Sequence, residues 1–324
     1  QGTKMIELAN NYLAPEKCNF EKKPSLLYSE KEEILWDIGY FGYKAEKYGT
    51  VDTYARKLFL NQSHSELSRL KISVSIFFTL WHLTNDFNFK SRKSGDENYR
   101  LEEIDRRYIS LLAAITETKN NKDVTIKDNI RFVTWNYDLQ LEFAFKAFNH
   151  DHLSLENISQ NLKFRCKIGD DNPLQICHLN GYHGYYYIDQ KEIDFLTISN
   201  TKDINEIIES ISYVSTSERR NQLQISSHIN YAWESNSLAE KTRTEANRIF
   251  SETDILVIIG YSFPNFNKEI DKMLFEKLKG RRTKIYYQDP NASEIFINQL
   301  VNREETEVIC DRVKRDNFYL PYEF

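Results

Sequence analysis

A group of polar residues follows a short apolar run in the segment Arg131–Phe145, RFVTWNYDLQLEFAF. The pattern predicts a buried strand over residues 132–135 that stops at Asn136-Tyr137-Asp138, with a helix after it. In an α/β sheet, ligands bind in the crevice beyond the carboxyl ends of the strands. An Asn and an Asp at that point can hold a ribose hydroxyl, a carbonyl or a water. In the alternative interpretation Asp138 caps the helix and Asn136 closes a turn, because both residue types favour such places.

A second group lies in ICHLNGYHGY, residues 176–185, where two histidines flank Asn180 and Gly181. His178 and Asn180 are two residues apart on an expected strand, so they share one face. A histidine that titrates near neutral pH is a candidate general base, which makes His178 and His183 candidates for that role. A structural role is the alternative, and a metal pair lacks a third ligand.

A third group follows the apolar run ILVII in the segment Ile255–Asp271. The run predicts a strand covered on both faces. Gly260 permits close approach of the backbone to a ligand, and Ser262 can donate to a ribose or phosphate oxygen. The alternative is an ordinary strand-to-helix connection that Asn267 caps.

The segment Lys284–Asn291, KIYYQDPN, is a further strand that ends in a polar turn. An acidic residue at such a strand end often holds an adenosine ribose. Gln288 and Asp289 are therefore candidates for that contact.

Helices and strands must position these groups of polar residues, and the spacing of apolar residues predicts where those elements lie. The apolar spacing predicts helices over 4–13, 30–48, 51–60, 65–83, 101–116, 201–212, 238–250, 268–278 and 294–302. Further strands are predicted over 164–168, 175–179, 283–287 and, as a last edge strand, 307–309, with 185–188 in a hairpin. Strands and helices that alternate towards the C-terminus indicate a parallel sheet. The fold class is therefore α/β, with a large helical N-terminal part.

Composition sets limits on the class of protein. The chain has 324 residues, 40% of them apolar, and a net charge of −5, which gives no support for a nucleic-acid-binding surface. The four cysteines are scattered without a C-x-x-C pair, which argues against a zinc site and suits a reducing compartment. No signal peptide or long apolar run is present, so we expect a cytoplasmic protein without a membrane contact.

Together the polar groups resemble the motifs of the sirtuin-like family, whose fold is an NAD-binding relative of the Rossmann fold. TWNYD (134–138) is similar to the family's T-x-N-[YI]-D motif, whose Asn and Asp approach the nicotinamide ribose. GYSF (260–263) is similar to its G-[TY]-S motif, which contacts the adenosine half of the cofactor. HLNGYHG (178–184) occupies the place of its catalytic His-Gly motif, and the resemblance covers residues 131–291.

The chain departs from the family pattern in three ways. The opening G-A-G-x-S loop is absent, and we expect it upstream of Gln1. If HLNG aligns with the family's x-L-H-G, Asn180 stands at the catalytic His position, which leaves His178 or His183 as the base. The four-cysteine zinc module of the protein-deacylating members is missing.

The resemblance implies one Rossmann-like domain over residues 1–324, with a helical part at 1–120 and an α/β NAD-binding core at 121–324. Without the zinc module, it implies an NAD glycohydrolase with NAD as substrate and no zinc, of the kind that acts in bacterial defence against phage. The implied catalytic residues are Asn136, Asp138, and His178 or His183. The implied NAD-binding residues are Thr134, Tyr137, Asn180, Gly181, Gly260, Tyr261, Ser262, Gln288 and Asp289.

Two other functions remain open from the sequence. One is an NAD-dependent protein deacylase, which needs an acyl-lysine peptide. The other is a non-catalytic subunit that senses NAD or ADP-ribose, which Asn180 and the missing Gly-rich loop favour. Because a protein that destroys NAD must be restrained, we also expect a homo-oligomer or a regulatory protein partner.

Overall fold

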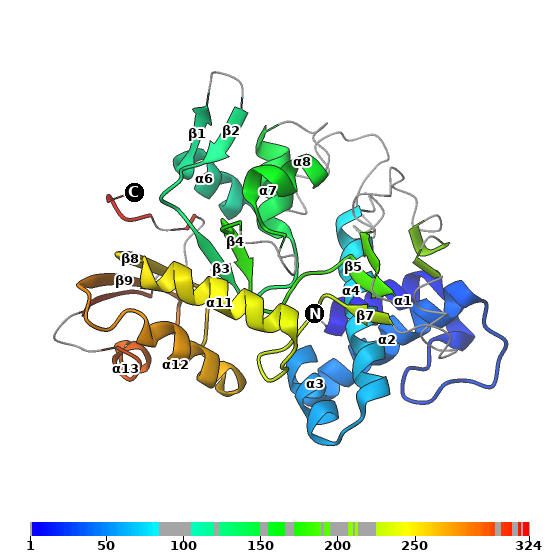
Figure 1. Cartoon of the computed structure of the whole chain (residues 1–324). Helices are drawn as coiled ribbons and strands as arrows, with labels where there is room; N and C mark the ends of the chain where they lie inside the picture. The colour runs from blue at the N-terminus through cyan, green and yellow to red at the C-terminus, as the bar shows by residue number, and fades with distance from the viewer. Residues whose placement is uncertain are drawn as a thin grey trace. The chain divides into compact units, whose positions relative to one another are not determined.

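A computed structural model describes residues 2–83, 105–119, 123–149, 155–165, 172–188, 191–194, 207–209, 211–212, 225–301, 306–312, 317–318 and 320–323. The chain forms two compact units, coloured along the sequence in Figure 1. Unit 1 combines Gln1–Asp96 with Gly181–Asn230, and unit 2 combines Glu97–Asn180 with Tyr231–Phe324. That the two units together form one domain stays a prediction.

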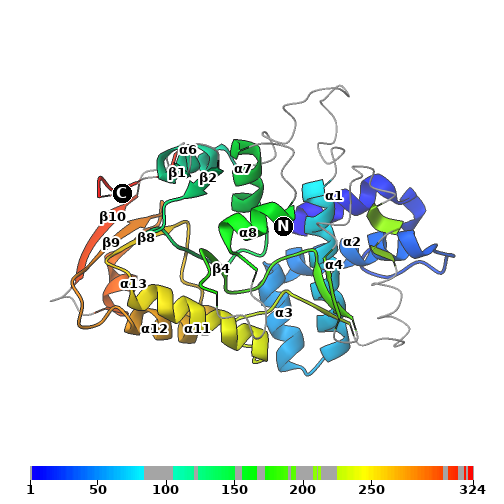
Figure 2. The same ribbon diagram turned by 45° about the horizontal axis from the view of Figure 1, so that its top comes forward.

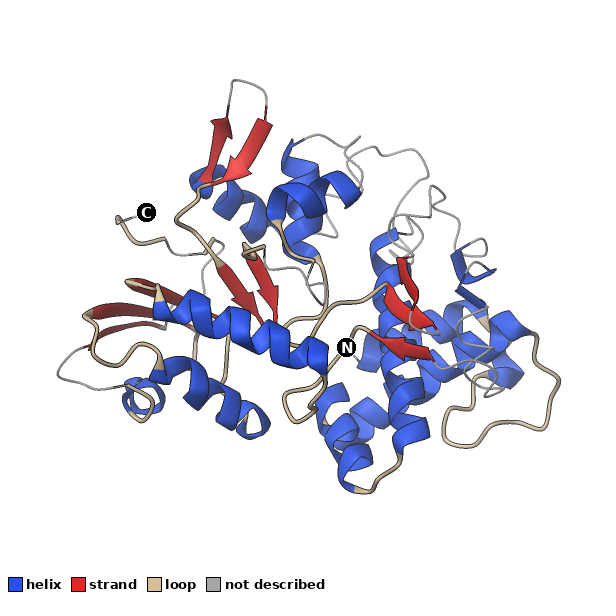
Figure 3. Ribbon diagram, viewed as in Figure 1, coloured by secondary structure: helices blue, strands red, loops and turns tan. Residues whose placement is uncertain are grey.

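Unit 1 is built mainly from four helices, drawn in blue in Figure 3. They are α1 (Gly2–Tyr12), α2 (Glu30–Tyr48), α3 (Val51–Leu60) and α4 (His64–Leu83), with a short 3-10 turn at Pro15–Lys17. The predicted bounds of α2 and α3 are confirmed, and the helical N-terminal part of the prediction is confirmed with them. Ser29 starts α2 with a capping box, in which its side chain accepts from the Glu32 N–H and the Glu32 carboxylate accepts in return.

A small antiparallel sheet completes unit 1. It has the order β6-β5-β7, with β5 at Tyr185–Ile188, β6 at Lys191–Asp194 and β7 at Ile225–Ser227. The predicted hairpin at 185–188 is confirmed, because β5 pairs antiparallel with β6.

Unit 2 contains a parallel sheet of the order β10-β9-β8. Its strands are β8 (Ile255–Ile259), β9 (Thr283–Gln288) and β10 (Thr306–Asp311), joined through α12 (Lys268–Glu276) and α13 (Glu294–Asn298). Both crossovers step in the same direction, and such crossovers are right-handed, so the two helices belong on one face. Figure 2 shows α12 and α13 grouped on one side of this sheet.

A second parallel pair in unit 2 consists of β3 (Phe132–Thr134) and β4 (Ile176–His178), with Thr134 opposite His178. The remaining elements are α6 (Arg106–Ile115), β1 (Thr116–Lys119), β2 (Asp123–Ile126), α7 (Gln140–Asn149), α8 (Leu155–Leu162), α11 (Ser237–Ser251) and the 3-10 turn Asn265–Asn267. Helix α11 contacts β4 and α12 in this unit.

Three expectations need correction or a coarser statement. The strand Ile255–Ile259 is only partly covered: Ile258 is buried and its four neighbours are half-buried, and among the described strands it pairs with β9 alone. Phe164 and Arg165 follow α8 without strand structure, and 166–168 lie outside the described residues. The parallel strands form two small sheets, so the structure shows a mixed α/β fold and leaves its Rossmann-like character a prediction.

The helix expected over 201–212 is described only at 207–209 and 211–212, where the chain is helical. The hairpin β1-β2 and strand β7 were not predicted. Among the described residues, no helix has both the length and the apolar character needed to cross a membrane.

Candidate functional site

The loop after β3 presents Asn136 to solvent. The backbone N–H of Asn136 donates to the hydroxyl of Thr134 over 3.0 Å, which closes a tight turn. The side chain of Asn136 is exposed and makes no hydrogen bond to the described part of the chain, whereas the next residue, Tyr137, is buried. The turn expected for Asn136 is therefore present, and it leaves the amide group available to a ligand.

The end of β4 holds this loop through two side chains. Nδ1 of His178 donates to the carbonyl oxygen of Asn136 over 3.0 Å, and Nδ2 of Asn180 donates to the carbonyl oxygen of Trp135 over 2.8 Å. Both side chains are buried, and their two-residue spacing directs them to the same loop, as the sequence predicts. Two consecutive carbonyls are thus fixed from one neighbouring strand.

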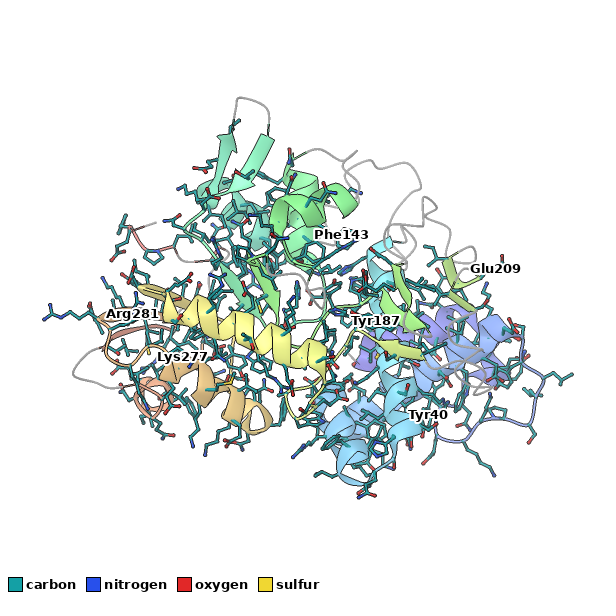
Figure 4. All side chains as sticks on the ribbon, in the orientation of Figure 1. Tyr40, Phe143, Tyr187, Glu209, Lys277 and Arg281 are labelled. Carbon is teal, nitrogen blue, oxygen red and sulfur yellow. The ribbon has the colours of Figure 1, made fainter. Side chains whose placement is uncertain are left out.

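Nε2 of His178 lies 2.7 Å from Oε1 of Glu142, a residue of α7. The two side chains are 3% and 1% exposed, so this is a pair of ionisable groups in the interior. Burial alone lowers the pKa of His178, but the Glu142 carboxylate and the Asn136 carbonyl favour the imidazolium more strongly, and the net effect raises the pKa. Figure 4 labels Phe143, the neighbour of Glu142 on α7.

Asp138 lies at the start of α7, where its Oδ1 accepts from the backbone N–H of Gln140 over 3.2 Å. Asp138 therefore makes the contact to the first residue of α7 that the capping interpretation predicts, and this contact uses one of its two carboxylate oxygens. Burial is the main cause that raises the pKa of Asp138 to about 6; the Gln140 N–H opposes it, and the Glu142 charge adds to it. The carboxyl group consequently changes charge just below neutral pH.

The ends of β3 and β8 meet through aromatic rings. The rings of Trp135 and Tyr261 stack with centroids 6.1 Å apart and planes inclined by 14°. The Tyr261 hydroxyl donates to the buried carboxyl group of Asp271 over 2.9 Å and accepts from Nδ2 of Asn267 over 3.0 Å. Asn267 therefore holds Tyr261, and its side chain does not cap α12.

The remaining residues predicted to bind the adenosine half lie around the ends of β8 and β9. Gly260 has φ +61° and is exposed, and its N–H donates to the Gln288 carbonyl over 2.9 Å. Ser262 is exposed, whereas Gln288 is buried. Asp289 accepts from the Asn291 N–H over 2.7 Å, as turn-forming residues do.

Gly181 and His183 belong to unit 1, whereas the other predicted site residues belong to unit 2. His183 is fully buried, with Nδ1 3.1 Å from the Thr79 hydroxyl and Nε2 3.1 Å from Nδ1 of His82. Gly181 has φ +67°, and a Cβ atom there would lie 1.9 Å from the His228 carbonyl oxygen. These contacts give both residues a structural place in unit 1.

Three residues of the unit 2 site were missed from the sequence: Glu142, Asp271 and, as a ring contact, Trp135. Glu142 carries the clearest signal, because it is an acidic residue within the apolar run Leu141–Phe145, all of which is buried. A carboxylate in an apolar helix segment needs a partner, since an unpaired buried charge is costly. One oxygen of Glu142 and the amide oxygen of Asn180 are buried without a hydrogen-bond partner in the described chain.

Within the described ranges, no cluster of three or more His, Cys, Asp or Glu residues could hold a metal ion. No family model, curated protein or solved structure matches this chain. The sirtuin-like assignment therefore stays a resemblance of motifs.

Proposed function

We propose that this protein hydrolyses NAD at the bond between nicotinamide and ribose. One observation carries the proposal: in unit 2, side-chain contacts join the carboxyl ends of β3, β4 and β8. His178 and Asn180 bond to the loop after β3, and Tyr261 stacks on Trp135 of that loop. These are the segments that resemble the sirtuin-like motifs, and strand ends of this kind bind nucleotides in α/β proteins.

The reaction needs a water molecule and a positioned ribose. The water oxygen forms a bond to C1′ of the ribose, the C1′–N bond breaks, and its electron pair leaves with neutral nicotinamide. The products are ADP-ribose, nicotinamide and one proton. Because the transition state resembles an oxocarbenium ion, groups that orient water and ribose hydroxyls accelerate the step. The exposed amide of Asn136 suits that task, and Asp138, whose pKa is about 6, is largely ionised above pH 7 and suits a ribose hydroxyl.

The adenosine half of NAD is proposed to lie at the ends of β8 and β9, in a Rossmann-like arrangement. Gly260 supports this placement because it is exposed and a Cβ there would meet no atom within 4 Å, so a ligand can approach the backbone. Tyr261 and Ser262 follow it directly, and Asp289 terminates the adjacent strand. Regulation by self-association or by a protein partner, in the setting of defence against phage, rests on the family resemblance alone.

The test is nicotinamide release from NAD by the purified chain, with Asn136→Ala as the variant. Loss of one preorganised polar group at the reacting centre predicts a fall in kcat of about 100-fold. Asn265→Ala is the matched control, because Asn265 is also exposed and also in unit 2 but lies in the turn before α12, and we expect near wild-type release. Equal activity of Asn136→Ala and wild type would contradict the proposal.

A second candidate function is a non-catalytic sensor of NAD or ADP-ribose. The observation that favours it is that both ring nitrogens of His178 already have protein partners. If HLNG aligns with the family's x-L-H-G, Asn180 also stands at the position of the catalytic histidine. Saturable NAD binding by calorimetry without nicotinamide release would favour the sensor.

A further inference from the structure

We propose that Glu142 and His178 form a positioning pair that sets the loop carrying Asn136, and that neither exchanges a proton with the substrate. This inference rests on the proposed function for its catalytic consequence. Its structural content, the link from α7 through β4 to the Asn136 carbonyl, does not depend on which ligand binds.

The proton positions follow from the partners of His178. A carbonyl oxygen only accepts, so Nδ1, 3.0 Å from the Asn136 carbonyl, must carry a proton. Nε2 faces Oε1 of Glu142 at 2.7 Å, and one proton lies between them whether the pair is imidazolium–carboxylate or imidazole–carboxylic acid. In either form no lone pair of the ring remains for a ligand. A general base needs such a lone pair within hydrogen-bond reach of the proton it takes.

The Glu142–His178 pair acts on the backbone of the loop after β3. His178 and Asn180 bond to the carbonyls of two successive residues, Asn136 and Trp135, which fixes the peptide planes of the turn. The Thr134 hydroxyl holds the Asn136 N–H at the same turn. The side chain of Asn136 makes no hydrogen bond to the residues that the structure describes, so its direction is set by contacts to its backbone.

Glu142 anchors the pair to α7. It is fully buried in the run Leu141–Phe145, and this helix begins two residues after Asp138. The charged groups near His178 are Glu142 on α7 and Asp138 in the loop, while Tyr108 of α6 lies in electrostatic reach of both carboxylates. No cation from α6 or α7 competes for Glu142 in the described ranges, which leaves His178 as its partner.

Two double variants isolate the role of the donor. Glu142→Gln removes the buried charge in both. Combined with His178→Asn, it keeps an amide N–H near the place of Nδ1, where it can still donate to the Asn136 carbonyl, but it provides no ring nitrogen as a base. Combined with His178→Ala, it removes the donor as well. Both variants thus lack the charge pair and the ring, and they differ in the residue 178 amide that can donate to the loop.

Two readouts are made on the full chain, nicotinamide release from NAD and deuterium exchange of residues 134–138. We expect Glu142→Gln/His178→Asn to keep wild-type protection and to stay within about 10-fold of wild-type kcat, and Glu142→Gln/His178→Ala to lose protection and about 100-fold in kcat, the cost of a small misplacement. If both variants lose activity equally while the asparagine variant keeps its loop protection, His178 acts on the substrate and the proposal is overturned.

Failure of the proposed function is recognised separately. If wild-type protein releases no nicotinamide, the exchange data still compare the two variants. Higher exchange over 134–138 in the alanine variant alone would uphold the positioning pair, and equal exchange in both would overturn it. Thermal unfolding of each variant verifies that the whole chain is folded, so a difference confined to 134–138 reports the loop itself.

Discussion

Unit 1 and unit 2 each bury a histidine whose two ring nitrogens are both engaged, yet the surroundings of the two rings differ. In unit 1, His183 contacts the neutral partners Thr79 and His82, and burial lowers the pKa of His82 to about 3. In unit 2, His178 faces the carboxylate of Glu142. The pKa of His178 is raised, although its side chain is buried like that of His183. Burial alone favours the neutral ring, and one carboxylate reverses the sign.

The different surroundings indicate different roles: the unit 1 histidines pack in the interior, whereas His178 organises the candidate site. The unit 1 histidines lie among aromatic rings, with His183 close to Phe78 and His82. The unit 2 histidine joins a carboxylate to the backbone of the loop that presents Asn136. An ion pair of this kind is a weak source of stability but fixes geometry, since breaking it leaves a buried charge uncompensated.

The largest effect is expected from His178→Leu, which leaves the Glu142 carboxylate buried without its partner. The expected loss in free energy of unfolding at pH 7 is about 4 kcal/mol. His183→Leu, the counterpart in unit 1, removes hydrogen bonds between neutral groups and should cost about 1.5 kcal/mol. Urea denaturation of both variants measures this, and equal losses would remove the distinction between the two histidines.

A smaller difference in stability loss is expected when two glycines with positive φ, one in each unit, are replaced by alanine. Gly181→Ala places a Cβ atom 1.9 Å from the His228 carbonyl oxygen, so backbone must move, at a cost of about 3 kcal/mol. Gly260→Ala meets no atom within 4 Å and carries only the conformational cost of about 1 kcal/mol. Thermal unfolding compares them. If Gly260→Ala lowers the stability as much as Gly181→Ala does, the close contact with the His228 carbonyl is not the reason why residue 181 must be glycine.

Asp271 tests whether burial without a counter-charge acts on acids as it does on His82. Burial raises the pKa of Asp271 from 3.8 to about 7, so its contribution to stability is complete below pH 4 and is lost as the pH rises towards 7. Asp271→Asn keeps an acceptor for Tyr261 and should flatten the fall in unfolding free energy between pH 4 and 7 by about 3 kcal/mol. An unchanged pH dependence in the variant would mean that Asp271 ionises normally.

The least perturbing experiment is an NMR titration of the ring protons and nitrogens. We expect His82 to stay neutral to pH 4 and His178 to keep its charge above pH 6.5, the ordinary midpoint. Glu142→Gln should bring the midpoint of His178 below 6.5, because burial, the largest single effect, is then opposed only by the Asn136 carbonyl and Asp138. A His178 midpoint that ignores this substitution would contradict the assignment of its charge to Glu142.

Local sequence patterns predicted those elements whose cause is local. The Ser29 capping box and the following Gly49 delimit α2, and apolar spacing found α11 and β9. The hairpin β1-β2 was not predicted because its strands, TETK and DVTI, have few apolar residues and show no alternation of apolar and polar residues. The position of β8 at the end of the order β10-β9-β8 was not predicted, because an apolar run does not show which strands pair with it.

The candidate site was predictable up to the point where long-range contacts begin. Strand ends and polar residues after them located Asn136, Asp138 and His178. The partner of His178, however, lies 36 residues away on α7, a separation that no periodicity encodes. For the same reason the sequence grouped His183 with His178, although the chain passes from unit 2 to unit 1 within the four residues between them.

The most direct test is to incubate the purified wild-type chain with NAD alone and to quantify nicotinamide and ADP-ribose by chromatography. We expect both products to appear in equal amounts without any peptide, and Asn136→Ala to lower the rate of release of both by about 100-fold. NAD that remains intact at a protein concentration sufficient to bind it would contradict hydrolysis and leave a binding function for the Asn136 loop.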